Sequence, residues 1–206
     1  MIRAVLILPL LVALAACGAG DVPTRAQIDA PDLAAAAPDP DPAPIAALTD
    51  QNTAQLARLL LGLSPQVDPE EAARAASIAY SYTAQLKSEY GITDPPLIHN
   101  AKVNAGLRPR GLCWHWAEDM ERRLKAEAFQ TLELHRAIAN HDNILIDHST
   151  AIISAKGATM FDGVILDPWR KGGRLVWMPV LEDRRYGWRP RAEVLQYYRD
   201  RDTKRG

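Results

Sequence analysis

Three residues in the second half of the chain, Cys113, His148 and Asp167, have the types and the order that catalysis by a thiol nucleophile requires. A thiol is mostly protonated at neutral pH, so a base must remove its proton before the sulfur can attack a carbonyl carbon. A histidine can remove that proton and later return it, and a carboxylate can fix the imidazole tautomer and stabilise its positive charge. Together the three side chains would support covalent acyl transfer.

A helix predicted over residues 112–128 would carry Cys113 in its first turn. The N-terminus of a helix favours negative charge, and its free backbone N–H groups can stabilise an oxyanion. Apolar residues recur along this segment at helical spacing and put Cys113 on the face toward the core. They are Cys113, Trp116, Ala117, Met120 and Leu124. Two other interpretations stay open, a small buried apolar residue and a thiol that senses oxidation.

The histidine and the carboxylate fall on predicted strands, which cover residues 131–139, 144–154, 163–169 and 174–180. Alternation along the second strand puts His148 on a buried face, where its ring needs a polar partner. The other residues of that face would be Ile144, Ile146, Thr150 and Ile152. A hairpin centred on residues 157–158 would pair His148 directly with Asp167, and a register shifted by two residues would leave them diagonal.

Three other histidines are candidates for the base. His115 lies two residues after Cys113 and so points to another side of the helix. His135 falls on a strand and His141 in a turn. We prefer His148 because only it combines a buried strand position with a nearby carboxylate. No metal is expected, because the chain lacks compact ligand spacings such as C-x-x-C or H-x-x-x-H.

Residues close to the proposed site in sequence are candidates for substrate binding. Trp114 and Trp169 could line a cleft, although core packing is the more common role of tryptophan. Asn104 and Asn100 precede the cysteine and could donate a hydrogen bond to an oxyanion, or could serve the loop structure instead.

The helical part of the chain lies before these strands. Helices are expected from Thr49 or Asp50 to about residue 62 and from Asp68 to about residue 90, with a loop over residues 93–110. A last helix is expected to start at Arg189-Pro190-Arg191 and to run through Tyr198. Helices followed by an antiparallel meander indicate an α+β domain with the helices packed on the sheet.

The segment from Gly111 to Trp169 resembles the transglutaminase-like superfamily, part of the wider papain-like group of cysteine enzymes. The resemblance rests on a cysteine that begins a helix, a histidine on a strand, and an Asp-Pro that ends the next strand. The matching residues are Gly111, Leu112, Cys113, Ala117, His148, Leu166, Asp167 and Pro168. The resemblance implies a papain-like core and a cysteine peptidase, amidase or acyltransferase. The superfamily also has members without catalysis, so fold analogy alone leaves the activity open.

The N-terminal residues predict an export signal. A short apolar run follows Arg3 and is below the length of about 20 residues that a membrane span needs, so residues 1–16 are interpreted as a signal peptide. The residues before and including Cys17 read LAAC, which resembles the bacterial lipobox. The resemblance implies cleavage before Cys17 and lipid on its thiol. Gly18 follows rather than Asp, as in lipoproteins sorted to the outer membrane.

Residues 17–47 are rich in Ala and Pro and are expected to form an extended tether, which leaves residues 48–206 for one folded domain. The domain is therefore expected on the periplasmic face of the outer membrane of a bacterial cell envelope. If Cys17 carries lipid, Cys113 is the only free thiol, since the chain has 2 cysteines.

Composition excludes several classes of protein. The chain has 206 residues with 48% hydrophobic and 24% charged, which excludes a wholly disordered protein or a multi-pass membrane protein. The net charge of −1 argues against nucleic acid as a partner. No phosphate loop or calcium loop occurs, so no cofactor is expected. The expected partner is a peptide, protein or cell-wall peptide substrate, and the alternative is a binding or scaffold lipoprotein without turnover.

Overall fold

The computed structural model describes residues 42–143 and 146–203. The predicted signal peptide, Cys17 and the tether up to residue 41 lie outside the described residues. Within those ranges, none of the helices combines the length and the apolar character that crossing a bilayer requires.

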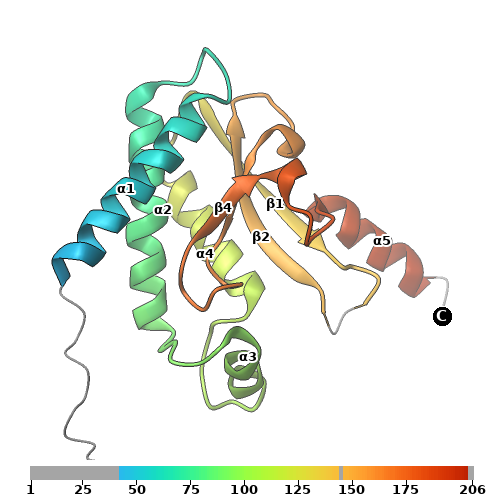
Figure 1. The fold of residues 1–206 in the computed structure, drawn as a ribbon. Coiled ribbons are helices and arrows are strands. Elements are labelled where there is room, and N and C mark those ends of the chain that lie inside the picture. Colours follow the sequence, from blue (N-terminus) through green and yellow to red (C-terminus); the bar gives the residue numbers. More distant parts are fainter. Residues whose placement is uncertain (1–41, 144–145, 204–206) are drawn as a thin grey trace, which may run out of the picture. The chain divides into compact units, whose positions relative to one another are not determined.

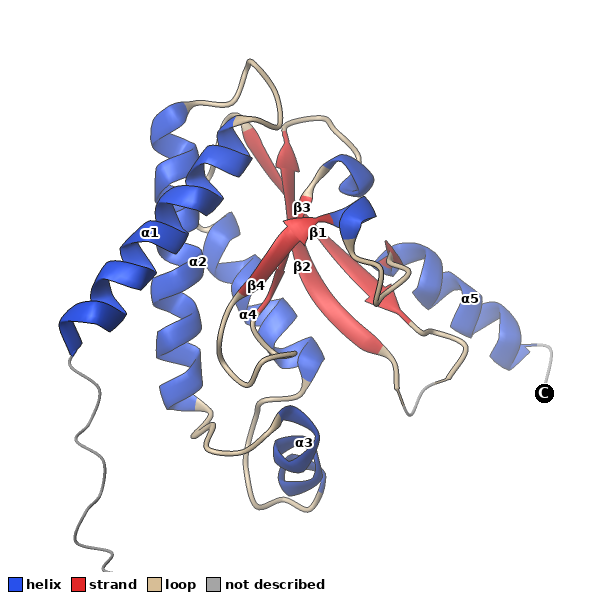
Figure 2. Ribbon diagram, in the orientation of Figure 1, coloured by secondary structure: helices blue, strands red, loops and turns tan. Residues whose placement is uncertain are grey.

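The described residues form an α+β domain of five α-helices and a five-stranded antiparallel sheet (Figures 1 and 2). The helices are α1 (Pro42–Leu61), α2 (Pro69–Glu89), α3 (Pro96–Asn104), α4 (Cys113–Lys125) and α5 (Arg191–Thr203). The strands are β1 (Leu132–Ala139), β2 (His148–Ala155), β3 (Val164–Asp167), β4 (Val176–Pro179) and β5 (Arg189–Pro190), with short 3₁₀ turns at Met160–Asp162 and Val180–Glu182. The strand order is β4-β3-β2-β1-β5. The α+β class and the antiparallel sheet are as predicted, but α3 and β5 are additional elements.

Local signals explain where α2 begins and how it joins the sheet. The Asp68 carboxylate accepts hydrogen bonds from the backbone N–H groups of Glu70 and Glu71 at 2.8 and 2.9 Å, which caps the helix. Glu71 is buried and accepts the backbone N–H groups of Gln130 and Thr131 at 2.7 and 2.8 Å. Burial alone would raise the pKa of this carboxyl, but these hydrogen bonds lower it overall. Glu71 therefore fixes α2 to the start of β1 as a carboxylate.

The sheet buries its two faces against different layers. Alternate side chains such as Ile153 and Leu166 pack with α1, α2 and α4, where Leu60 and Met120 are fully buried. The intervening side chains, such as Ile152 and Ile165, belong to a second cluster with Met160, Val180 and Trp188 from the segments after β2 and β4. Each fully buried aliphatic side chain contributes about 1.5–3 kcal/mol.

Two expectations about the helices are wrong. The first helix begins at Pro42 and not at Thr49 or Asp50, so residues 42–47 of the expected tether are helical. Proline suits a first turn, and the alanines that follow favour a helix. The expected loop over residues 93–110 contains α3. Pro96 again occupies the first turn, and proline there starts a helix although it would break one further in.

The second strand begins later than predicted, at His148. Residues 144–145 lie outside the described residues, and Ile146 is exposed in the turn before the strand and does not share the buried face. The expected register is also wrong by two residues, because Ala151 pairs with Leu166. Continued by one pair, this register sets Thr150 opposite Asp167 and leaves His148 diagonal to it. The 3₁₀ turn at Met160–Asp162 lengthens the connection and moves its centre.

Candidate active site

The backbone before α4 is held in a conformation that requires glycine. Gly111 has φ of +123°, and a Cβ built there would lie 2.3 Å from Nε2 of His99. His99 is buried on α3, and its Nε2 is 2.9 Å from the carbonyl oxygen of Arg110. The Gly111 carbonyl in turn accepts the indole N–H of Trp116 at 3.1 Å. α3, which was not predicted, thus positions the segment that leads into Cys113.

His115 is a structural residue of this turn. Its Nδ1 accepts the backbone N–H groups of Gly111 and Leu112 at 3.1 and 3.2 Å. Burial, and then the charge of Arg110, lower the pKa of His115, which agrees with a neutral ring that accepts hydrogen bonds. His115 therefore satisfies two N–H groups at the start of α4, and its ring is not free to act as the base.

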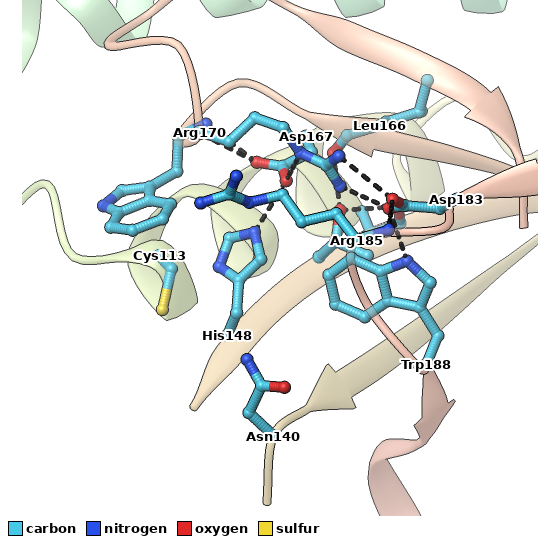
Figure 3. A network of polar contacts seen from close by, with 12 residues as sticks. Cys113, Asn140, His148, Leu166, Asp167, Arg170, Asp183, Arg185 and Trp188 are labelled. Carbon is cyan, nitrogen blue, oxygen red and sulfur yellow. Dashed lines mark hydrogen bonds and ion pairs between the residues drawn. The ribbon is translucent and has the colours of Figure 1, made fainter. Parts of the chain in front are cut away.

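Cys113 and His148 approach each other at the ends of their elements. α4 packs on the face of the sheet that carries Ile153 and Leu166, whereas His148 belongs by alternation to the face of Ile152. The two meet because Cys113 is the first residue of α4 and His148 the first residue of β2 (Figure 3). The Cys113 side chain is nearly buried, and its Sγ lies 3.9 Å from the carbonyl oxygen of Asp147.

His148 and Asp167 form a buried pair. Nε2 of His148 lies 2.6 Å from Oδ2 of Asp167, and each side chain is at most 2% exposed. Burial opposes a charged ring, but the Asp167 carboxylate outweighs it, and with a smaller contribution from Cys113 the pKa of His148 is raised to about 9. Burial likewise opposes the carboxylate, yet His148 and Arg170 lower the pKa of Asp167 overall. The pair is therefore an imidazolium and a carboxylate at neutral pH.

The other ring nitrogen of His148 is available for chemistry. Nδ1 is buried and has no hydrogen-bond partner among the described residues. Cys113 contributes to the charge state of His148 through side-chain contact, and Figure 3 shows its sulfur on the Nδ1 side of the ring, away from Asp167. The proton on Nδ1 of His148 is therefore held on the side of the ring that faces the Cys113 sulfur.

The free energy of unfolding should depend on pH because of the His148–Asp167 pair. Because the pKa of His148 is raised from 6.5 to about 9, its contribution is fully present below pH 6.5 and is lost as the pH rises through about 9. At about 1.4 kcal/mol per pKa unit, the unfolding free energy should fall by about 3 kcal/mol between pH 6 and 9.5. Urea unfolding of the protein and of His148→Gln would measure it, and an equal fall in both would assign it to other groups.

Aromatic rings enclose His148. The ring centroids of Trp169, Tyr186 and Trp188 lie 4.7, 4.6 and 5.3 Å from that of His148. Trp169 also donates its indole N–H to the Asn100 side chain at 3.0 Å, which connects the site to α3. The three rings exclude water from the His148–Asp167 pair and so strengthen its electrostatic interaction.

Of the predicted substrate-binding residues, Trp169 lies at the site, whereas Trp114 and Asn104 are exposed. Trp169 contacts the site directly. Trp114 is 46% exposed, and its ring contacts that of His115 at a tilt of 44° with 3.8 Å between ring centroids. Asn104 is exposed at the end of α3, and Asn100 is the asparagine that contacts Trp169.

The two remaining histidines lie elsewhere. Nε2 of His135 is 2.8 Å from the Ser154 hydroxyl, and His141 packs against Tyr197. Across residues 42–143 and 146–203, no group of three or more His, Cys, Asp or Glu could hold a metal ion.

Arg170 and Asp183 were missed by the sequence analysis. Nε of Arg170 donates to Oδ2 of Asp167 at 2.6 Å, and its Nη2 donates to Oδ2 of Asp183 at 2.6 Å. Arg170 follows the Asp-Pro of β3 by two residues, which is the one local signal that could have suggested it. Asp183 lies after β4 and gave no signal in sequence.

No family model, curated protein or solved structure matches the chain, so comparison with known proteins assigns neither a family nor an activity to this site. The arrangement itself provides a nucleophile at a helix N-terminus, an ion-paired histidine and a buried carboxylate. Those groups suffice for nucleophilic attack and proton transfer without a metal ligand set.

Proposed function

We propose that this protein is a cysteine hydrolase or acyltransferase that attacks amide bonds of a peptide, protein or cell-wall peptide through Cys113, His148 and Asp167. The observation that carries the proposal is the buried His148–Asp167 pair at 2.6 Å, whose free nitrogen faces a thiol at the start of α4. A papain-like core is part of the same proposal. It is supported by the order of the three residues and by the helix that begins with the cysteine.

The first half-reaction forms a thioester. The Cys113 thiolate attacks the amide carbonyl carbon, and first-turn N–H groups of α4 stabilise the resulting oxyanion. The C–N bond then breaks, and the proton on Nδ1 of His148 passes to the leaving amine. Asp167 keeps the imidazole oriented while its charge changes.

The second half-reaction releases the acyl group. Neutral His148 takes a proton from a water molecule, and the oxygen attacks the thioester carbon. The C–S bond breaks, Cys113 leaves as the thiolate, and a carboxylic acid is formed. An amine in place of water would give transfer with the same proton movements. Hydrolysis is the simpler outcome, because water needs no acceptor site.

The cellular location belongs to this proposal. The lipobox-like sequence that ends at Cys17 supports a lipid anchor, and the Ala- and Pro-rich segment after it supports a tether. An enzyme held on the periplasmic face of the outer membrane would meet envelope proteins and cell-wall peptides.

The test is bond cleavage that depends on Cys113. The full chain with Cys17→Ser, in which Cys113 is the only thiol, is incubated with a mixture of peptides of varied sequence. New amino groups and a mass shift of the Cys113 peptide by one acyl group are expected. Cys113→Ala should abolish both, while Cys113→Ser should fold normally and lose at least 100-fold in rate.

The rival function, a binding or scaffold protein on the same fold, makes the opposite prediction. Neither cleavage nor acylation would then occur. Substitution of Cys113 would leave the cellular phenotype of the protein unchanged.

A further inference from the structure

The proposed site continues beyond Asp167 as a row of four buried groups with alternating charge. We call His148, Asp167, Arg170 and Asp183 the charge row (Figure 3). Each successive pair is joined by a nitrogen–oxygen contact of 2.6 Å. None of the four side chains is more than 9% exposed.

Asp183, at the far end of the charge row, accepts hydrogen bonds from several groups. Besides Arg170, Asp183 accepts the indole N–H of Trp188 at 3.0 Å and the backbone N–H of Arg185 at 3.1 Å. Trp188 is also one of the rings around His148. The guanidinium of Arg170 lies over the ring of Tyr186, with 4.8 Å from its central carbon to the ring centroid. The segment 183–188 therefore contacts both ends of the row.

Charge counting shows what each member does to the others. Asp167 and Arg170 alone would be neutral, so whenever Cys113 is a neutral thiol an imidazolium beside them would leave one uncompensated positive charge in the interior. Such a charge is costly in a region of low dielectric constant. Asp183 supplies the compensating negative charge, and with it the row is neutral when His148 is protonated.

Arg170 also has a geometric role. Its Nε and the Nε2 of His148 both contact Oδ2 of Asp167, while Oδ1 of Asp167 accepts the backbone N–H groups of Trp169 and Arg170. The Asp167 carboxylate is thus fixed in one orientation by donors on both oxygens. It cannot rotate away from His148 without losing several charge-assisted hydrogen bonds.

We infer that Arg170 and Asp183 are positioning residues of the catalytic site: Arg170 orients Asp167, and Asp183 balances the charge of Arg170 so that His148 remains an imidazolium beside Cys113. This inference rests on the proposed function for its purpose. The charge coupling itself can be measured without any substrate.

The inference requires opposite effects from the two ends of the row. Asp183→Asn removes the compensating negative charge and should lower the pKa of His148, whereas Arg170→Gln removes a positive charge next to Asp167 and should raise it. Arg170 contacts the same Asp167 oxygen as His148 and so lies nearer to the ring than Asp183 does. Through an effective dielectric constant of about 20, unit charges at about 5–10 Å shift a pKa by roughly 1–2 pH units, so the larger shift is expected for Arg170→Gln. The double variant should titrate between the two single variants.

The experiment is an NMR titration of the full Cys17→Ser chain with isotope-labelled histidine, with His148 assigned by His148→Gln. The exposed pair of Arg189 and Glu193 provides the matched control, and Glu193→Gln should leave the His148 titration within about 0.2 pH units of its original midpoint. Thermal unfolding of each variant establishes that it is folded at the temperature of the titration. Arg170→Lys keeps the charge but not the forked geometry, so it should fall between Arg170→Gln and the unaltered protein.

Two results would overturn the inference. Shifts in the same direction for Asp183→Asn and Arg170→Gln would show that both act only by loosening the fold. Folded variants that leave the His148 titration unmoved would show that the row carries no coupling. Failure of the proposed function is distinguishable, because Cys113 of the unaltered chain would then neither cleave peptides nor become acylated while the opposite shifts persist.

Discussion

His148→Ala is expected to remove the reactivity of Cys113 toward iodoacetamide at pH 6 to 6.5 and to move half-maximal alkylation to about pH 8.5, where an isolated thiol ionises. The physical reason is the loss of the imidazolium that faces Cys113 and favours its thiolate. In the unaltered protein, pairing with His148 should instead sustain a plateau of alkylation on the acidic side of the range. A second rise is expected as His148 deprotonates near pH 9, because the thiolate is then no longer ion-paired.

The measurement is the alkylation rate between pH 4 and 10, followed by the mass of the Cys113 peptide in the Cys17→Ser chain. His135→Ala is the matched control, since His135 is a strand histidine bonded to Ser154 and distant in function from the site. It should preserve the plateau. Identical single titrations near pH 8.5 in all three proteins would reject His148 as the base.

His148→Ala should reduce the rate of turnover by a larger factor than it reduces the rate of alkylation at low pH. General acid–base catalysis contributes about 10²–10⁴-fold, and His148 acts in both half-reactions. Asp167→Asn should also reduce turnover, because the amide cannot stabilise the imidazolium as a carboxylate does. Its effect on alkylation should be a lower plateau at pH 6.

Gly111→Ala is expected to destabilise the protein by about 2–5 kcal/mol and to remove the low-pH reactivity of Cys113. The substitution combines a strained backbone at φ +123° with a Cβ placed 2.3 Å from the His99 ring. His99 cannot yield easily, because it is 1% exposed and is held by the Arg110 carbonyl. The adjacent first turn of α4 must then shift and move Cys113 away from His148.

Gly157→Ala separates strain from steric clash. Gly157 has φ of +78°, but a Cβ there meets no atom within 4 Å. The free energy of unfolding should therefore fall by only about 1 kcal/mol. The clash itself is tested in a His99→Ala background, where adding Gly111→Ala should cost clearly less than it does alone. Urea unfolding measures all four proteins. Equal losses for Gly111→Ala and Gly157→Ala would mean that His99 does not constrain the turn.

Much of the site follows from short-range patterns. The apolar spacing from Cys113 to Leu124 is visible in sequence, and the structure buries both residues and begins the helix at Cys113. The β-branched alternation around residue 150 likewise predicts a buried strand, which β2 confirms. Such patterns depend on neighbours within a few residues, so they can be interpreted without knowing the fold.

Other features depend on the length and shape of connections. The 3₁₀ turn after β2 moved the register by two residues, and His148 meets Asp167 diagonally instead of directly. α3 was not predicted, because proline breaks a helix at most positions but is favoured in a first turn, where Pro96 lies. Both errors come from chain segments in which one residue type is compatible with two local structures.

The sequence by itself determined the α+β class, the helix that carries Cys113 in its first turn and the strand that carries His148, because propensity and periodicity are local. Only the tertiary structure decided that α4 and His148 lie on opposite faces of the sheet and meet at its end. It also joined Arg170 to Asp183 and His99 to Gly111. These contacts unite residues from separate elements, and their energies depend on burial and distance, which exist only once the chain has packed.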